Sequence, residues 1–225
     1  MQLVVYDTPE EMARSAAERI ASLIGDAGDG FSLGLAGGST PAATYRRLSE
    51  APIGWDHVQT WLSDERWVPP DDERSNGRMA AETLTDRVSV AFHRPPWREG
   101  MSPAESAAEY EAALRSIHRA GPPDLVLLGM GEDGHTASLF PGTRALEMAE
   151  RWFVANNVPQ LGEVRLTATY PLLWSARRLM VLVAGERKAE ALKESLEGET
   201  PAGRLMEGGA EVEWHVDTAA AALIS

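Results

Sequence analysis

The sequence predicts an α/β protein of the three-layer type, in which helices cover both faces of a mostly parallel sheet. Short apolar runs alternate with amphipathic segments along the chain, and this alternation is typical of parallel strands joined by helices. The strongest run, DLVLLG at 124–129, is continuously apolar, as expected for a strand buried on both sides. No repeat or low-complexity linker divides the 225 residues, so we expect a single domain over 1–225.

Each element follows from a local pattern. Six apolar runs predict strands: LVVY at 3–6, FSLGLAG at 31–37, VQTWLS at 58–63, DLVLLG at 124–129, RLMVLVAG at 178–185, and VEWHV at 212–216, which closes the sheet. Helices are expected over about 9–24, 39–48, 77–88, 103–119 and 186–196, with a short one after the last strand. Capping boxes with proline at the first helical position, Thr8 with Glu11 and Ser102 with Glu105, mark two helix starts. Two prolines and a polar cluster make ERWVPPDDERSNG, residues 65–77, a predicted loop.

Composition limits the class of protein. The chain is 44% hydrophobic and contains no cysteine, so disulfides, thiolate metal sites and a cysteine nucleophile are excluded. With 34 acidic and 21 basic residues the net charge is −13, which disfavours nucleic acid and anionic membranes as partners. The N-terminus lacks the basic and apolar regions of a signal peptide, and no run approaches the ~20 apolar residues of a membrane span. We expect a cytoplasmic protein, as a monomer or small homo-oligomer.

The loop after the strand at 124–129 carries the strongest candidate for chemistry. Its glycines have the spacing G-x-G-x-x-G of dinucleotide-binding loops, and Glu150 lies at a suitable distance for a ribose contact. A long helix does not follow, however, because Pro141 comes too soon. The loop also carries Asp133 and His135, and a histidine beside a carboxylate in such a loop favours acid–base chemistry over a structural role. The other histidines show no metal-ligand spacing, so no catalytic metal is expected.

Two further loops after strands could bind an anion. AGGSTP places Gly37, Gly38, Ser39 and Thr40 at a helix start, where free N–H groups and the helix dipole favour negative charge. The alternative is a simple helix cap with flexible glycines. Lys188 lies in the first turn of a predicted helix, where a cation is disfavoured unless an anion is near. Pairing with Glu186 at the surface is the alternative for this lysine.

The loop SDERWVPP follows the third strand and presents Asp64, Glu65 and Arg66 together. In open parallel sheets ligands bind at the carboxyl ends of strands, so these side chains are candidate ligands of a substrate. Such a charge cluster is otherwise a solvated turn. Arg165, in EVRLTATYP, is a similar candidate, with exposure at the start of an element as the alternative.

Four blocks in order resemble the 6-phosphogluconolactonases, which are close in fold to the glucosamine-6-phosphate deaminases. The blocks are LAGGSTP, LSDERWVPPDDERSN, LVLLGMGEDGHTASLFPG and RLTATYPLLWSARRLMVLVAGERKAEAL. The resemblance implies a Rossmann-like fold of the deaminase/lactonase type and no cofactor. It implies that GGSTP and Lys188 hold a substrate phosphate, with Arg66 and Arg165 lining the site. It places Asp133, Gly134 and His135 at the lactone.

The implied reaction is hydrolysis of 6-phospho-D-glucono-1,5-lactone, the second step of the oxidative pentose phosphate pathway. Such an ester needs an activated water and donors for the developing oxyanion. A histidine, with a reference pKa of ~6.5, can take the proton of water, and Asp133 could orient His135 or stabilise its cation.

Three alternatives remain. The nearest is a deaminase or isomerase of amino-sugar phosphates, whose family carries a glutamate five positions after the histidine where this chain has Phe140. A non-catalytic sugar-phosphate sensor would keep the anion loop and Lys188 but could dispense with His135. A dinucleotide oxidoreductase is the most distant alternative.

Overall fold

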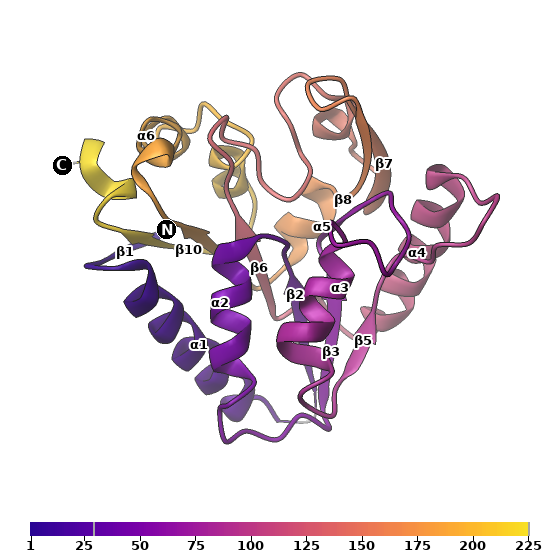
Figure 1. Cartoon of the computed structure of the whole chain (residues 1–225), viewed down its shortest axis with the longest axis horizontal. Coiled ribbons are helices and arrows are strands. Elements are labelled where there is room, and N and C mark those ends of the chain that lie inside the picture. The colour runs from indigo at the N-terminus through magenta and orange to yellow at the C-terminus, as the bar shows by residue number, and fades with distance from the viewer. Residues whose placement is uncertain (29, 225) are drawn as a thin grey trace.

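A computed structural model describes residues 1–28 and 30–224, and it places a seven-stranded sheet at the centre of the molecule (Figure 1). All neighbouring strands in this sheet are parallel. Their order is β1 (Gln2–Tyr6), β10 (Glu211–Asp217), β9 (Arg178–Val183), β6 (Leu125–Gly129), β2 (Phe31–Leu35), β3 (Val58–Leu62) and β5 (Ala91–His93). The predicted three-layer α/β fold is therefore confirmed.

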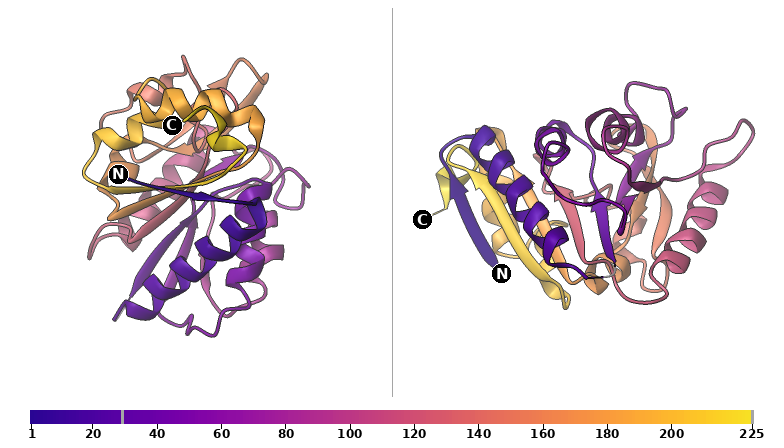
Figure 2. Two further views of the ribbon diagram at one scale, coloured as in Figure 1. Left: turned by 90° about the vertical axis from the view of Figure 1, so that its left-hand side faces the viewer. Right: turned by 90° about the horizontal axis from the view of Figure 1, so that it is seen from below.

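Helices cover the two faces of the sheet (Figure 2). One face is covered by α1 (Pro9–Asp26), α2 (Ser39–Leu48) and α3 (Asn76–Ala80), which continues as a π-helical turn over Ala81–Thr85. The other is covered by α4 (Pro103–Ile117), α5 (Tyr170–Ser175) and α6 (Ala189–Leu196). Thr8 and Ser102 cap α1 and α4 as the sequence predicts. None of the helices in the described ranges is long and apolar enough to cross a membrane.

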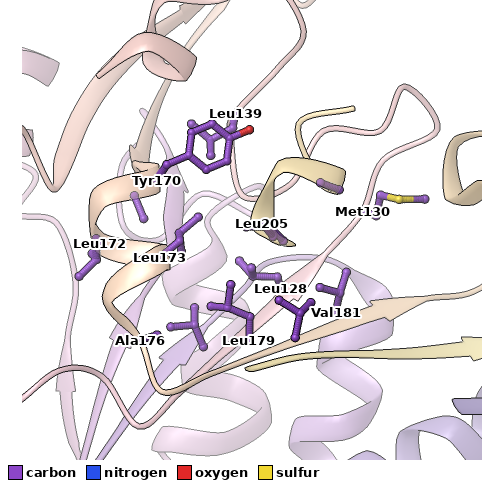
Figure 3. Packing of buried hydrophobic residues seen from close by; sticks show 14 of the residues in the cluster. Leu128, Met130, Leu139, Tyr170, Leu172, Leu173, Ala176, Leu179, Val181 and Leu205 are labelled. Atoms are coloured by element: carbon purple, nitrogen blue, oxygen red, sulfur yellow. The ribbon is translucent and has the colours of Figure 1, made fainter. Parts of the chain in front are cut away.

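The central strands are buried because they are apolar on both sides. Leu125, Leu127 and Met180 contact the layer of α1, whereas Leu128, Leu179 and Val181 pack under α5. Figure 3 shows the second group with Leu172, Leu173 and Leu205 filling the space between sheet and helices. Because the central strands are packed on both faces, their positions are fixed by the core. The loops that follow their carboxyl ends lie outside this core and can take different paths.

A second, small antiparallel sheet was not predicted. It consists of β4 (Asp64–Arg66), β8 (Glu163–Ala168) and β7 (Phe153–Val158). The expectation that 65–77 is a loop throughout is thus wrong at its start. Polar and charged residues interrupt these three strands, so they lack the apolar runs that mark the central ones. This sheet pairs a segment that follows β3 with one a hundred residues later, which local patterns do not reveal.

Several predicted boundaries need correction. The strand predicted at 31–37 ends at Leu35, because Gly38 turns the chain with a φ of 106°. The predicted helix over 77–88 begins at Asn76 and ends in the π-helical turn at Thr85. The last strand, β10, does not close the sheet, since β1 pairs along its outer side. β5 was not predicted, because it is only three residues long and precedes prolines.

Candidate active site

A cavity of about 330 Å³ lies at the carboxyl ends of β2, β3, β6 and β9. Segments far apart in the sequence meet there because parallel strands present their following loops at one edge of the sheet. The predicted site residues that line it are Gly37, Gly38, Ser39, Thr40, Asp64, Arg66, His135, Arg165 and Lys188. Asp133 is not among the lining residues, and it lies behind His135 as a hydrogen-bond partner.

The glycine loop after β2 exposes backbone to the cavity. Gly38 is the N-cap of α2 and has a φ of 106°, a conformation that side chains with a Cβ rarely adopt. A Cβ at Gly37 would overlap the side chain of Asn76. No side chain caps α2, so the first-turn N–H groups are not satisfied by a cap and favour an anion. Gly38 itself occupies the N-cap position, which agrees with the alternative of a simple helix cap with flexible glycines as well as with an anion site.

Two arginines form one wall of the cavity. Arg66 on β4 and Arg165 on β8 are directly opposite each other in the small sheet. The side chain of Arg165 is 13% exposed and pairs with Glu163 at 2.8 Å. Burial, and next the charge of Arg66, lower the pKa of Arg165. The Nε atoms of both arginines are buried without a hydrogen-bond partner. Two crowded cations with spare donors make this wall suited to a negatively charged ligand.

Lys188 approaches the same cavity from the turn after β9. It ends the short helical turn Glu186–Lys188, and burial lowers its pKa although Glu132 and Asp217 act in the opposite direction. Within the described ranges Lys188 forms no ion pair, and Glu132 pairs instead with Arg187 at 3.1 Å. The predicted alternative, pairing of Lys188 with a neighbouring glutamate, is therefore not formed. A desolvated ammonium group without a counterion fits an anion site.

His135 is held on two sides. Its Nδ1 lies 2.5 Å from Oδ1 of Asp133, and its ring stacks on Phe140 with 3.9 Å between centroids. Gly134, with a φ of 72°, allows the tight turn between the two partners, and a Cβ at Gly131 would overlap the imidazole. Since Nδ1 is occupied by Asp133, Nε2 is the nitrogen available for exchange of a proton.

Asp133 is the anionic partner of this pair. Burial alone would raise the pKa of its carboxyl, but the hydrogen bond and charge of His135 outweigh this effect, and the pKa is lowered. The carboxyl also accepts the backbone N–H of His135 at 3.2 Å. A carboxylate in this position selects the tautomer with a proton on Nδ1 and stabilises the imidazolium cation.

The two carboxylates of the SDER segment have different surroundings. Asp64 is buried, lines the cavity and accepts a hydrogen bond from the Ser138 hydroxyl at 2.8 Å. Glu65 is not among the lining residues, because its oxygens bind the hydroxyl of Ser75 and the N–H groups at the start of α3. Burial raises the pKa of Glu65, against these hydrogen bonds. Asp64 is thus available to a ligand, whereas Glu65 anchors α3.

Sequence reasoning did not single out several lining residues. Asn76 donates from Nδ2 to the carbonyl of Asp64, and its Oδ1 is buried without a partner. Ser138 follows Ala137, the only residue other than glycine with a positive φ, 48°, in the described ranges. Asn76 lies in the block LSDERWVPPDDERSN and Ser138 in LVLLGMGEDGHTASLFPG, but neither residue was predicted to belong to the site. Their polar side chains, close in sequence to predicted site residues, were the feature of the sequence that could have identified them.

Among the residues that the structure describes, no group of three or more histidine, aspartate or glutamate side chains is arranged to hold a metal ion. The buried His118 bonds to Ser32 at 2.7 Å, and the buried His215 bonds to Tyr6 and Glu213. These histidines hold elements of the fold together.

The fold and the cavity define a Rossmann-like α/β protein whose site combines a glycine loop at a helix start, three cations and a carboxylate–histidine pair. The particular family follows from the sequence. The chain belongs to the family of glucosamine-6-phosphate isomerases and 6-phosphogluconolactonases, which it matches over residues 7–214.

Three known proteins illustrate the similarity. The 6-phosphogluconolactonase of Nostoc sp. is 37% identical over 207 residues, which cover 87% of this chain and 85% of that protein. The structure of 6-phosphogluconolactonase from Trypanosoma brucei superposes with a TM-score of 0.86 at 26% identity, covering 100% of this chain and 98% of the other. A monomeric glucosamine-6-phosphate deaminase has a TM-score of 0.84, also at 26% identity, with 99% and 100% covered. Because fold similarity extends to both activities, the site has to discriminate between them.

Proposed function

We propose that the protein hydrolyses 6-phospho-D-glucono-1,5-lactone to 6-phospho-D-gluconate. The observation that carries this proposal is the pair of Asp133 and His135 facing a cation-lined cavity, with a phenyl ring beside the imidazole. The 37% identical relative from Nostoc sp. is named 6-phosphogluconolactonase and supports the same activity. We expect the enzyme to work in the cytoplasm, without cofactor or nucleic acid, as a monomer or small homo-oligomer.

In the proposed mechanism, Nε2 of His135 takes a proton from water as the water oxygen bonds to the lactone carbonyl carbon. Asp133 stabilises the imidazolium that results. The tetrahedral intermediate then collapses, the bond between carbonyl carbon and ring oxygen breaks, and the imidazolium returns its proton to that oxygen. Backbone N–H groups of the glycine-rich loop at 129–135 would stabilise the oxyanion.

The phosphate would be held at the other end of the cavity. Gly37, Gly38, Ser39 and Thr40 present the start of α2, and Lys188 supplies a positive charge that forms no ion pair within the described ranges. Arg66 and Arg165 add a second positive wall. Because the phosphate does not react, its binding would fix the lactone ring against His135, so that binding energy serves orientation.

Phe140 supports the lactonase over the deaminase. Its ring is 5% exposed and stacks on His135, where the deaminase family carries a glutamate. A phenyl ring cannot transfer a proton, so ring opening and release of an amine lack one acid–base group here.

The decisive experiment generates the lactone enzymatically and follows its decay with and without the protein, against a buffer blank. The blank is needed because the lactone also opens unaided in water. We expect faster decay with protein and no ammonia from glucosamine 6-phosphate. Ammonia release at a rate comparable to lactone turnover would reverse this assignment.

A second arm of the experiment tests the chemistry of the site. Activity should survive thiol-blocking reagents, because the chain has no cysteine, and should survive EDTA. Loss with EDTA that a divalent metal restores would show that a metal takes part in the reaction.

A further inference from the structure

Two buried tyrosine hydroxyls lie where central strands end and site loops begin. Tyr45, on α2, accepts the backbone N–H of Ala36 at 2.8 Å and donates to the carbonyl of the same residue at 3.0 Å. Ala36 directly follows β2 and precedes Gly37. The hydroxyl therefore ties the last residue before the glycine loop to the helix that the loop begins.

Tyr110 makes the corresponding contact from α4, on the opposite face of the sheet. Its hydroxyl accepts the N–H of Leu62 at 2.8 Å and donates to the carbonyl of His93 at 3.0 Å. Leu62 ends β3 and His93 ends β5, so the hydroxyl lies between two strands at the point where their pairing stops. Asp64 follows two residues after Leu62.

These backbone groups lie where strand pairing ends: Ala36 follows the last paired residue of β2, and Leu62 and His93 are the last paired residues of β3 and β5. The pairing of β2 with β6 involves only Leu33 and Gly34, and its pairing with β3 ends at Leu35. Beyond these points the strands diverge to make room for the cavity. Ala36 is 2% exposed and Tyr45 is fully buried, so bulk water cannot replace the hydroxyl. A buried N–H or carbonyl group left without a partner is costly, and the loop would move to avoid that cost.

We propose that Tyr45 and Tyr110 are positioning residues of the active site. Tyr45 sets the glycine loop for the phosphate. Tyr110 positions Asp64. Because Asp64 accepts a hydrogen bond from Ser138, Tyr110 also positions the turn that carries His135. This proposal rests on the proposed function in so far as the glycine loop is taken to bind phosphate. It predicts that the two hydroxyls affect different kinetic constants.

The test compares Tyr45→Phe and Tyr110→Phe on the phosphorylated lactone and on gluconolactone, which has no phosphate. The matched control is Tyr6→Phe, because Tyr6 also uses a hydroxyl in hydrogen bonds, to His215 at 2.8 Å and Ser15 at 3.1 Å, but lies outside the cavity. All three changes remove one oxygen atom and keep the ring.

For Tyr45→Phe we expect KM for the phosphorylated lactone to rise about tenfold, with kcat within about threefold and gluconolactone turnover within about threefold. For Tyr110→Phe we expect kcat to fall about tenfold on both lactones. Tyr6→Phe should lower the midpoint of thermal unfolding and leave both constants within about twofold. If Tyr45→Phe and Tyr110→Phe behave as Tyr6→Phe does, the hydroxyls serve stability only and the proposal is wrong.

Two further measurements test the proposal if the wild type is inactive on the lactone or if a variant does not fold. Inorganic phosphate should raise the midpoint of thermal unfolding of the wild type more than that of Tyr45→Phe, even if the wild type proves inactive on the lactone. If the wild type is inactive on the lactone, the proposed function fails, but the phosphate measurement still tests the role of Tyr45. If the wild type does not bind phosphate, the proposed phosphate site and the role of Tyr45 are both wrong. If a variant does not fold, hydrogen exchange of the wild type decides: the amides of Ala36 and Leu62 should be as protected as those inside β2 and β3, and rapid exchange contradicts the proposal.

Discussion

Two carboxylate–histidine pairs with the same spacing occur in this molecule, and they have opposite surroundings. Asp133 and His135 lie in the loop after β6, with side chains 46% and 28% exposed. Glu213 and His215 lie on β10, with side chains 3% and 5% exposed. In a strand, residues i and i+2 face the same side, so the pair on β10 follows from secondary structure alone. In the loop, the two groups meet across a turn at Gly134, which has a positive φ.

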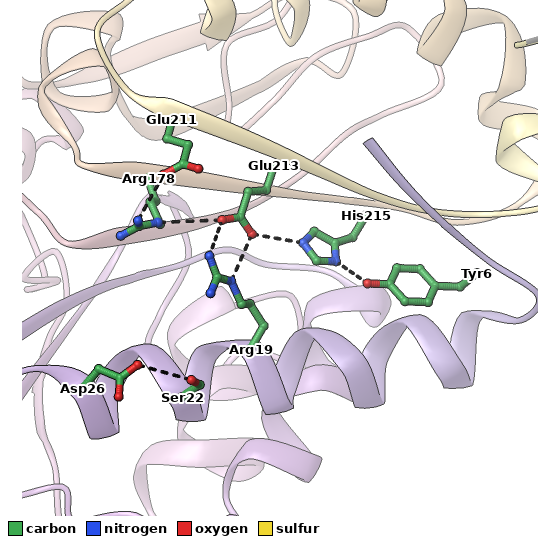
Figure 4. Close-up of polar contacts among 8 residues, drawn as sticks. All are labelled: Tyr6, Arg19, Ser22, Asp26, Arg178, Glu211, Glu213 and His215. Carbon is green, nitrogen blue, oxygen red and sulfur yellow. Dashed lines mark hydrogen bonds and ion pairs between the residues drawn. The ribbon is translucent and has the colours of Figure 1, made fainter. Parts of the chain in front are cut away.

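In the buried pair, the carboxylate of Glu213 and both ring nitrogens of His215 already have partners within the protein. Figure 4 shows Glu213 between Arg19 and Arg178 and next to His215, whose other nitrogen contacts Tyr6. The nearest contacts are 2.9 Å from Arg19 to Glu213 and 2.8 Å from Tyr6 to His215. Every group in this network binds another, and the network joins β1, β9 and β10 to α1.

The comparison shows that a carboxylate beside a histidine does not by itself make a reactive pair. His135 differs because one nitrogen remains available and because the cavity in front of it collects positive charge from Arg66, Arg165 and Lys188. The first pair should therefore control turnover, and the second should control stability.

The largest expected effect comes from His135→Gln. Removing a general base costs ~10²–10⁴ in rate, so kcat should fall by that factor while inorganic phosphate binds nearly as before. The measurement is steady-state kinetics on the lactone. His215→Gln is the matched control and should keep kcat within a few-fold while lowering the midpoint of unfolding. If kcat falls equally in the two variants, the pair of Asp133 and His135 has no special role in turnover.

The same variants separate the pairs by pH. Since general-base catalysis by an imidazole uses its neutral form, wild-type kcat/KM should rise with pH. His135→Gln should lose this rise, and His215→Gln should keep it. If a folded His135→Gln turns over within a few-fold of wild type, the base lies elsewhere, and Asp64 is the next residue to test, because Glu65 is committed to α3.

Asp133→Asn should have the next largest effect. An amide in place of the carboxylate can hold the wrong tautomer of His135 and no longer stabilises its cation, so kcat should fall by about 10²-fold or more. Glu213→Gln makes the same chemical change in the buried pair and should leave kcat unchanged. Kinetics on gluconolactone should show the same loss for Asp133→Asn, because the lactone is the reacting group. A loss confined to the phosphorylated substrate would contradict the assigned role.

Lys188→Ala should have a smaller effect, on binding. A charge-assisted hydrogen bond contributes about 1.5–3 kcal/mol, so kcat/KM for the phosphorylated lactone should fall roughly 10–100-fold, mainly through KM. Lys193→Ala, the other lysine of the chain, is the control and should have no such effect. Gluconolactone turnover should be unchanged by either variant. Equal damage to both lactones by Lys188→Ala would show that the lysine does not contact the phosphate.

Apart from the short edge strand β5, the sequence predicted the strands of the central sheet and the gathering of the site, because both follow from local patterns and one geometric rule. Continuous apolar runs gave β2, β3, β6 and β9, and loops after parallel strands meet at one edge. It could not predict the small sheet, in which Asp64–Arg66 pairs with a distant segment of mixed polarity. That pairing turns Arg66 and Arg165 into one wall, so their cooperation was beyond local reasoning.

Supporting contacts were also beyond the sequence. Nothing local shows that Ser138 binds Asp64, that Phe140 stacks on His135, or that Glu65 points away from the cavity. The contact between Asp133 and His135 was left open because a separation of two residues permits it without requiring it. The backbone conformation at Gly134, which the sequence does not reveal, accompanies the contact between the two side chains.

The smallest effect on turnover, and the clearest on stability, is expected from Glu213→Gln. The hydrogen bond from His215 and then Arg19, against the effect of burial, lower the pKa of Glu213 from 4.5 to about 2. A carboxyl whose pKa is depressed in the folded state adds stability above its unfolded pKa and loses it as the pH falls through the folded value. The wild type should therefore lose stability between about pH 5 and 2, and Glu213→Gln should depend less on pH there.

At pH 7 the variant should be less stable by about 1–3 kcal/mol, because Arg19 and His215 lose their partner. Glu211→Gln, which changes an exposed carboxylate paired with Arg178 at 3.1 Å, should alter neither the stability at neutral pH nor its acid dependence. Urea unfolding from pH 2 to 7, together with lactone turnover at pH 7, measures both properties. Unchanged acid dependence in Glu213→Gln would show that the buried pair does not stabilise the fold, and a loss of turnover without a loss of stability would place it in the reaction.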